Sequence, residues 1–574
     1  MKNTLCFLLL TASLLATATG YSTAPPSAQA DQAAAQASVP SESILPFAAA
    51  AIPVESSLET VSSEIESSAE ASAPVYTVSY PLEGSHLELS YWMPFKSPHE
   101  TVQSFGDFPV LATAQQLTGV TVHFTSENLM TAEEKFNLMV ASGDYCDLIG
   151  GTLGYYSGNY EEALADGIAI DIGDMLETAA PDYYSMLTAN ADSYRATIDD
   201  NGMMIAVYTI KDQYFPVMGG TVIRQDWLDT LGYEAPASLD ELDQFLRACK
   251  STYGANYSIM LNYSNYENLL SASLGIGGGD CVDGLYQLDG EVRYTYVQPE
   301  YQTYLSLAAA WYRDGIISRD FMNVGTTGLP MENYSYVYSG DTAIITATAS
   351  EVASIEAETG NGCKLAGYSF PAADGSGRTH FTDMSMIKSS EHATISEQCE
   401  DPELALNWLN YWFTEYGTVV ANYGTEGESF RFDKDQQPQW TDLITANAYD
   451  LPANRASAIY TLYAHTTPIH TMETRLSSTF TQDEQAIYDI WMTGIDGACL
   501  MPAVSLTEDE SEIARSPLAD IQTYVDENVA KFINGTRPLD EFDNFVKDIE
   551  GMGLSDILHV YQTALERYEH RNIR

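Results

Sequence analysis

The spacing of apolar and polar positions predicts alternating strands and helices at the start of the folded chain. Residues 86–92, HLELSYW, alternate between polar and apolar side chains, as a half-buried strand does. A helix is expected around residues 110–117, a second strand at 121–126, and a helix followed by a short strand within 131–151. This strand–helix–strand–helix–strand order is the opening of an α/β domain.

Capping and turn residues mark the limits of further elements. Ser238 stands three residues before Glu241, which is the spacing of a capping box that opens a helix. Asp289–Gly290 separates two short runs as the turn of a hairpin. Asp401 precedes Pro402, so we expect an N-cap followed by a proline at the first helical position.

The carboxyl-terminal region has the periodicity of helices. The apolar residues of 521–532 and of 539–549 each fall on one helical face. A last helix is expected from Ser555 towards Tyr568, after two glycines have broken the pattern. An α/β beginning with a helical end fits a large two-lobed α/β protein better than a β-sandwich or a repeat array.

The amino terminus has the composition of a secretory leader. Lys2 precedes an apolar core that runs from Leu5 to Leu15, and this core is too short to span a membrane. We assign residues 1–30 to a signal peptide, with a buried helix as the alternative. Residues 31–75 are rich in Ala, Ser and Pro, with acidic residues and no Lys or Arg, so we expect a disordered linker there.

The formal net charge of the chain is −55, from 25 basic and 80 acidic side chains. A field of this sign repels phosphate backbones and anionic lipid surfaces, so we expect no nucleic-acid partner. It also disfavours a highly anionic ligand. The solubility of an exported protein is the plainer explanation of the charge and is sufficient by itself.

Sequence motifs for catalysis or metal binding are absent. The seven cysteines have no C-x-x-C spacing, and the nine histidines do not pair on a helical face. G-x-S-x-G, H-E-x-x-H and phosphate-loop motifs do not occur, so we expect no cofactor, no metal and no enzyme. Paired carboxylates could serve a glycosidase, but 80 acidic residues produce such pairs by chance. The disulfide state of the six cysteines beyond the leader stays open.

Four separated blocks of the chain share a pattern with one protein family. They are VIRQDWLDTLGYEAPASLDELDQFLRACK (222–250), GEVRYTYVQPEYQTYLSLAAAWYRDGIISRDF (290–321), DPELALNWLNYWFTEYGTVVANYGTEGESFRFD (401–433) and YVDENVAKFINGTRPLDEFDNFVKDIEGMGLSDILHVYQTALERY (524–568). Together they resemble the bacterial extracellular solute-binding proteins of family 1, in particular the long LplA-like lipoproteins that serve carbohydrate ABC importers. The blocks keep their order and spacing from about Leu87 to Tyr568.

The resemblance implies the type II periplasmic-binding-protein fold, with two discontinuous α/β lobes joined by a hinge and a ligand cleft between them. The chain is expected to cross between the lobes near Tyr214–Gly220 and again near Gly367–Asp383. Residues 76–215 would form the first part of lobe one, and 216–375 the main part of lobe two. The mostly helical residues 376–574 would return to both lobes.

The function that the resemblance implies is capture of a sugar or oligosaccharide and its delivery to the permease subunits of an ABC importer. We also expect a monomer whose lobes close around the ligand without turnover. Two alternatives stay open: a secreted carbohydrate-active enzyme on an α/β scaffold, and a surface receptor or adhesin that kept the binding fold. No motif identifies the ligand itself.

Aromatic and polar side chains at strand ends are the expected sugar contacts, because rings stack on sugar faces and carboxylates bond the hydroxyls. Trp92 ends the first strand and has core packing as its alternative role. Asp147, Gly151 and Tyr155 flank a later strand. The alternative for Asp147 is a cap that binds backbone amides.

Two further pairs of ligand contacts follow from the same resemblance. Arg224 and Trp227 come after the first crossing, and their alternatives are an ion pair with Asp226 and packing at a helix start. Tyr423 and Glu426 lie in NYGTEG after a helix, where the family borders its cleft. A structural turn built on the glycines is the alternative for this loop.

The leader departs from the family at one position. LplA-like proteins carry a lipobox cysteine, whereas this chain has Tyr21 after Gly20, so thioether lipidation at this site is chemically impossible. Cleavage after Ala18 or Ala30 fits the two A-x-A patterns. We therefore expect an exported protein, extracellular or held at the cell envelope, with a sequence error at position 21 as the alternative.

Overall fold

The structure is a computed structural model that describes most of the chain beyond its amino-terminal segment. The described residues are 76–571, apart from 85–86, 213–218, 255–270, 272, 278–283, 318, 320, 322–337, 341, 374–379, 382–384, 450, 464–466, 494 and 498. The predicted leader and linker lie outside the described residues, as does most of the predicted first crossing.

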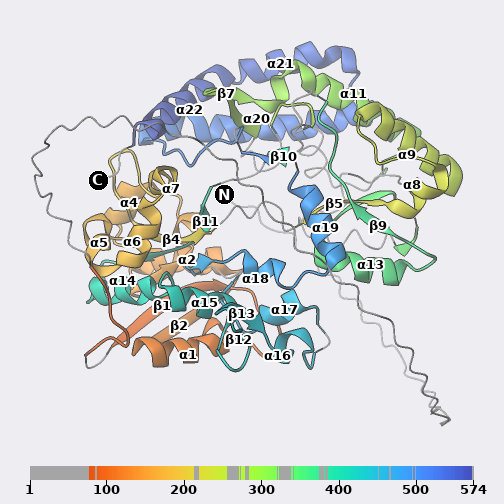
Figure 1. The fold of residues 1–574 in the computed structure, drawn as a ribbon. Helices are drawn as coiled ribbons and strands as arrows, with labels where there is room; N and C mark the ends of the chain where they lie inside the picture. Colours follow the sequence, from red (N-terminus) through yellow and green to blue (C-terminus); the bar gives the residue numbers. More distant parts are fainter. Residues whose placement is uncertain are drawn as a thin grey trace, which may run out of the picture. The chain divides into compact units, whose positions relative to one another are not determined.

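A six-stranded sheet, parallel but for one strand, is the centre of the first lobe (Figure 1). Its strands are β1 (Glu88–Phe95), β2 (Thr121–Asn128), β3 (Leu148–Gly150), β4 (Ala206–Lys211), β11 (Ile387–Ile395) and β14 (His470–Thr471), in the order β14-β4-β11-β3-β1-β2. β11 runs antiparallel to β3 and β4, and the other pairings are parallel. The carboxyl ends of the other five strands therefore meet at one edge of the sheet.

The alternation in the first strand decides which side chains reach each face of this sheet. Tyr91 belongs to the main core of the lobe and meets the ring of Trp408 from α14 (Pro402–Tyr411). Trp92 belongs to a separate cluster and packs against Phe136 of α2 (Ala132–Ser142). Because successive side chains on a strand point to opposite faces, β1 supports both layers of the lobe.

The second lobe is built on three antiparallel strands and a set of long helices. β5 (Gly219–Arg224) lies between β8 (Ile344–Thr348) and β9 (Leu365–Gly367). The helices are α8 (Gln225–Leu231), α9 (Leu239–Tyr253), α11 (Pro299–Asp314), α20 (Glu508–Ile533), α21 (Phe542–Gly551) and α22 (Leu554–Glu569). Figure 1 shows α11, α20, α21 and α22 packed side by side, and they share a core with Trp311 and Phe532. Within the described ranges, no helix is both long and apolar enough to cross a bilayer.

Each lobe is completed by chain segments that are far apart in the sequence. The main core of the first lobe uses residues from 89–210 and 387–469. The main core of the second lobe uses residues from 223–370 and 518–565, and α19 (Gln482–Trp491) packs on its sheet. The chain therefore changes lobe between β4 and β5, between β9 and β11, and between β14 and α19.

Short strand pairs complete the secondary structure. β6 (Leu285–Leu288) and β7 (Glu291–Tyr294) form the predicted hairpin, whose turn residues Asp289 and Gly290 have φ angles of 54° and 81°. Positive φ at both central residues is the requirement of a tight hairpin turn. The other pairs are β10 (His380–Phe381) with β15 (Ile495–Asp496), and β12 (Phe430–Phe432) with β13 (Pro438–Trp440).

The two predicted helix starts differ in how they are capped. Asp401 accepts a hydrogen bond from the amide of Leu404, with Pro402 at the first helical position, as expected. At α9 the box is half formed: Ser238 accepts from the amide of Glu241, but the Glu241 carboxylate binds the amide of Ala237. One free amide of the first turn, that of Glu241, therefore has a side-chain acceptor, and the Glu241 carboxylate ties down the residue before the cap.

Five of the six cysteines beyond the predicted leader carry thiols that form no disulfide: Cys146, Cys249, Cys363, Cys399 and Cys499. The sixth, Cys281, lies outside the described residues. Burial raises the pKa of Cys249 to about 12 and that of Cys399 to about 11. These two thiols are therefore protonated and unreactive at neutral pH.

Candidate functional site

The carboxyl edge of the first-lobe sheet is the place where a ligand of this fold would be contacted. In open α/β sheets, ligands bind beyond the carboxyl ends of the strands. At this edge β1 ends at Phe95, β3 at Gly150, β4 at Lys211 and β14 at Thr471. The residues that follow these positions are the candidates for contact.

The segment after β3 is held in place by a buried histidine. The amide of Gly151, whose φ is 71°, donates to the carbonyl oxygen of His392 at 2.9 Å. The amide of Leu153 donates to Nε2 of the same histidine at 2.8 Å, and Nδ1 lies 2.8 Å from the carbonyl oxygen of Ser389. Burial lowers the pKa of His392 to about 4, so the ring is neutral, with the proton on Nδ1. This ring fixes the short helix α3 (Thr152–Tyr155) at the edge of the sheet.

Trp92 is packed in a buried cluster of the first lobe, which is its alternative role. Its side chain is 4% exposed, and its ring makes edge contacts with Phe136 at 5.8 Å and with Tyr155 at 6.2 Å. Tyr155 is half-buried and closes over this cluster from α3. Of these two predicted contacts, Tyr155 is the one with surface to offer a ligand.

Asp147 lies at the opposite edge of the sheet from Gly151. It comes immediately before β3, and its carboxylate accepts hydrogen bonds of 2.7 Å from the amide and the hydroxyl of Ser90 in β1. The Ser90 hydroxyl oxygen accepts in return from the amide of Asp147 at 2.9 Å. Asp147 therefore makes the capping interactions of its alternative role, at the amino end of its strand, and its role as a ligand contact stays a prediction.

Arg224 and Trp227 lie at the end of β5 that is remote from the passage between lobes. β5 begins at Gly219, where the chain arrives from the first lobe, and Arg224 is five residues further, or roughly 16 Å at strand spacing. Its guanidinium binds Asp226 through two hydrogen bonds of 2.8 and 2.6 Å and covers the Trp227 ring at 4.3 Å. In the structure Arg224 is ion-paired with Asp226 and Trp227 is packed at the start of α8, which are the alternative roles predicted for them.

Tyr423 and Glu426 belong to a turn within the first lobe. Tyr423 is 1% exposed and packs its ring against Phe430 and Trp440. Its carbonyl oxygen accepts from the hydroxyl of Ser429, and Gly424 has a φ of 86°. The structural turn is therefore formed.

Glu426 is exposed in an open surface hollow of about 560 Å³, where its carboxylate accepts from the hydroxyl of Tyr416 at 2.9 Å. The hollow is lined by first-lobe residues only: Thr113, Gln116, Leu117, Tyr416, Thr425, Glu426, Gly427, Arg431 and Phe432. They come from α1 (Pro109–Thr118), from α15 (Glu415–Tyr423) and its following turn, and from β12.

Two carboxylates at the ends of β4 and β14 were not among the predicted contacts. Oδ1 of Asp212 accepts from the amide of Glu473 at 3.0 Å. Oε1 of Glu473 lies 3.5 Å from the hydroxyl of Tyr488 in α19, which packs on the second-lobe sheet. First-lobe carboxylates and a second-lobe hydroxyl therefore meet at the carboxyl edge. No sequence signal marks this group, since it depends on the two-residue strand β14.

The electrostatics of this group favour an uncharged or cationic partner. Burial, and the negative charge of Asp212, raise the pKa of Glu473. Asp212 itself is exposed and has no basic partner among the contacts of the described chain. Carboxylates in such a position accept hydrogen bonds from hydroxyl groups and repel acids. Within the described residues, no group of acidic, histidine and cysteine side chains could hold a metal ion.

Comparison with known proteins agrees with this architecture. No family model matches the chain. A fructooligosaccharide ABC transporter substrate-binding protein, FusA of Streptococcus pneumoniae, is 22% identical over 491 residues, which cover 80% of this chain and 87% of the relative. The lipoprotein LipO of Bacillus subtilis is 23% identical over 223 residues, 37% of this chain and 42% of the relative.

Solved structures show the same fold at low identity. The alginate-binding protein AlgQ2 aligns with a TM-score of 0.65 and 18% identity, over 86% of this chain and 99% of that protein. An HMO-binding solute-binding protein of Bifidobacterium longum infantis aligns with a TM-score of 0.66 and 17% identity, over 84% of this chain and 99% of that protein. The predicted resemblance to extracellular solute-binding proteins is confirmed, and so is the two-lobed α/β fold.

Proposed function

We propose that this chain is the extracellular substrate-binding component of an ABC importer and that it captures a sugar or oligosaccharide between its two lobes. The observation that carries the proposal is the meeting of Asp212 and Glu473 with Tyr488 of the second lobe at the carboxyl edge of the first sheet. A ligand bound there would touch both lobes at once. Contact with both lobes is what couples binding to closure.

The chemistry of this edge suits a neutral polyol. The two carboxylates accept hydrogen bonds from sugar hydroxyls, and the half-buried ring of Tyr155 supplies a surface for an apolar sugar face. The backbone at Gly151 lies at the same edge. The four proposed first-lobe contacts, Gly151, Tyr155, Asp212 and Glu473, follow three different strands, β3, β4 and β14. FusA, the relative with matching length, is named for fructooligosaccharide, which is a ligand of this class.

The proposal includes the partners and the location that the family implies. The closed form would be recognised by permease subunits, and the protein would act as a monomer outside the membrane. The relatives are named as binding proteins and a lipoprotein, which supports binding without turnover over a carbohydrate-active enzyme. Position 21 bears on attachment: in Tyr21→Cys, lipid labelling of the exported chain would show that the tyrosine alone prevents anchoring.

A melting-temperature panel tests the proposed function. Residues 31–574 would be mixed with neutral fructo-oligosaccharides, milk-type and N-glycan-type oligosaccharides, uronate oligomers and peptides, with product formation followed in parallel. A ligand at about 100 times its Kd adds about 2.7 kcal/mol to stability, which is a shift of several degrees. We expect a shift with one class of neutral sugar and no product. A new reducing end would favour the enzyme, and a flat panel would contradict sugar capture.

A further inference from the structure

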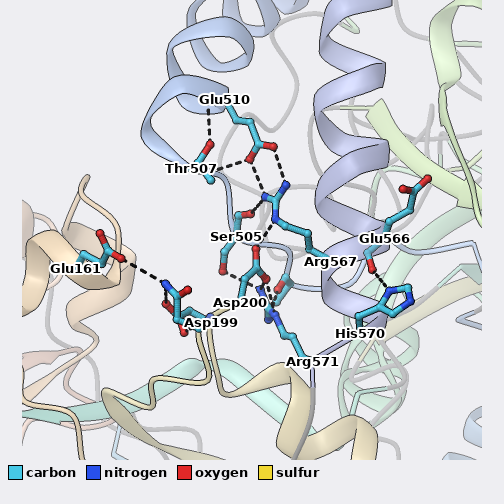
Figure 2. Close-up of polar contacts among 12 residues, drawn as sticks. Glu161, Asp199, Asp200, Ser505, Thr507, Glu510, Glu566, Arg567, His570 and Arg571 are labelled. Atoms are coloured by element: carbon cyan, nitrogen blue, oxygen red, sulfur yellow. Dashed lines mark hydrogen bonds and ion pairs between the residues drawn. The ribbon is translucent and has the colours of Figure 1, made fainter.

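Besides the chain passages, an ion-pair cluster also joins the two lobes. Asp200 lies in the first lobe, in the turn between α7 (Ala191–Ala196) and β4. Oδ1 of Asp199 accepts from the amides of Asn201 and Met203 at 2.9 and 2.8 Å, which fixes this turn. The turn holds the Asp200 carboxylate against arginines of the second lobe (Figure 2).

Two arginines, Arg567 in α22 and Arg571 just past the end of this helix, each bind one carboxylate oxygen of Asp200. Nε of Arg567 donates to Oδ2 at 2.7 Å, and Nε of Arg571 donates to Oδ1 at 2.8 Å. The two arginines are four residues apart, so they lie on one side of the chain at the end of α22. α22 is anchored in the second-lobe core by Ile557 and Leu565.

The two terminal nitrogens of Arg567 bind a glutamate in the first turn of α20. Its Nη1 and Nη2 donate to Oε1 and Oε2 of Glu510, each at 2.7 Å, as Figure 2 shows. Glu510 also accepts from the amide of Thr507 and so completes the capping box of this helix. Burial opposes the charge of Glu510, but Arg567 and the hydrogen bonds with Thr507 together outweigh it and lower the pKa of the carboxyl.

Arg571 is enclosed on every side. Its side chain is 1% exposed, and it donates to the hydroxyl of Ser505 and to the carbonyl oxygens of Arg195 and Ala503. The ring of Tyr568 lies 4.9 Å from its guanidinium carbon. Another arginine of the second lobe also binds the first lobe: Nη1 of Arg515 in α20 donates to the carbonyl oxygen of Ser157.

We infer that this cluster of Asp200, Glu510, Arg567 and Arg571 is a fixed pivot, which stays formed while the two lobes open and close around a ligand. Its two acids and two arginines balance in charge, within a chain that has only 25 basic residues against 80 acidic ones. Separating it would leave the enclosed Arg571 without an acidic partner and Asp200 without a basic one, which is a large penalty. Single contacts between the lobes, such as Asn454 Nδ2 to Ser350 Oγ at 2.9 Å, break at far lower cost.

The inference rests on the proposed function only in expecting that the lobes move. Hydrogen-exchange mass spectrometry of residues 31–574, without ligand and with kestose or the panel sugar that shifts melting most, tests it directly. We expect the amides of 199–203 and 567–571 to keep the same protection in both states while other segments at the lobe boundary change. Protection that falls at the cluster when the sugar binds would overturn the pivot.

The variant Asp200→Asn adds a second readout, and Asp435→Asn, in an exposed pair with Lys434, is its matched control. We expect roughly hundredfold faster exchange at both 199–203 and 567–571 in the first variant, a lower melting temperature, and sugar affinity that is equal or weaker. Arg567→Lys, which keeps the charge but cannot bridge Asp200 and Glu510, should show the same pattern in a milder form. Tighter sugar binding by Asp200→Asn would mean that the cluster holds the lobes open, and would overturn the pivot.

The two proposals fail in different ways. If no sugar changes melting or exchange anywhere, the proposed function is contradicted, and the pivot is judged on unliganded Asp200→Asn alone. Faster exchange in that variant that spreads into both lobes supports a pivot. Faster exchange confined to the end of α22 contradicts it.

Discussion

The indole of Trp491 lies directly against Gly220, and its Nε1–H donates to the carbonyl oxygen of the next residue, Thr221, at 2.7 Å. A Cβ atom added at Gly220 would sit 2.6 Å from carbons of this ring, closer than real contacts allow. The contact holds α19 against the strand that opens the second lobe. It links the second segment that enters this lobe to the first.

Gly220→Ala should therefore destabilise the fold. The ring is fully buried and cannot withdraw without losing its hydrogen bond, so we expect a loss of about 1–3 kcal/mol in the free energy of unfolding. Denaturant unfolding measures this loss. Gly551→Ala, where an added Cβ meets nothing within 4 Å, is the control and should change stability little. Equal stability of both variants would mean that α19 does not pack as described.

Trp92 and Tyr155 should separate packing from binding. Trp92→Ala removes a large buried side chain and is expected to cost about 3–5 kcal/mol in unfolding free energy. Tyr155→Ala removes a half-buried ring at the ligand edge, so its larger effect should be on sugar affinity. Chemical denaturation and calorimetric titration, applied to both variants, decide the assignment. A Trp92 variant with normal stability and lost binding would restore the tryptophan to the ligand site.

Glu473→Gln should weaken sugar binding by about tenfold or more, because a hydrogen bond to a charged acceptor contributes about 1.5–3 kcal/mol. Glu426→Gln is the matched control, since that carboxylate lies in the hollow between α1 and β12. Titration with the panel sugar gives both affinities. If the Glu426 variant loses affinity and the Glu473 variant does not, the ligand site is at the NYGTEG turn instead.

The same glutamate predicts a pH effect without ligand. Its pKa is raised above the ordinary 4.5 in the folded state, so the folded state holds a proton longer than the unfolded chain does. This contribution to stability is present at low pH and is lost as pH rises through the raised folded pKa. Glu473→Gln should therefore melt higher than the wild type at pH 7 and equally at pH 4. A lower melting temperature of the variant at pH 7 would contradict the raised pKa.

His392 predicts a pH slope of the opposite sign. Burial lowers its pKa from 6.5 to about 4, so between these pH values the unfolded chain binds a proton at this histidine and the folded chain does not. The contribution of His392 to the free energy of unfolding is fully present above pH 6.5. It is lost as the pH falls towards 4, by an amount on the order of 3 kcal/mol. His392→Gln, whose amide can replace both hydrogen bonds, should flatten the melting profile in this window. His123→Gln, at an exposed position, should leave the slope unchanged.

The sequence predicted elements more successfully than it predicted contacts. The hairpin at Asp289, the cap at Asp401 and the carboxyl-terminal helices follow from signals within a few residues, and they are found where expected. Asp147 was predicted as either a ligand contact or a strand cap, and its hydrogen bonds to Ser90 depend on the pairing of β3 with β1, which no local sequence pattern shows. Asp212 and Glu473 meet only through the pairing of β4 with β14, a relationship between residues 261 positions apart.

The interleaving of the lobes also governs when the protein can begin to fold during synthesis. The first-lobe core uses residues up to Ile469, and the second-lobe core uses residues up to Leu565 of α22. Neither core can close on the emerging chain until these late segments have been made. The first lobe therefore cannot complete its core before residues 219–370 of the second lobe have been synthesised.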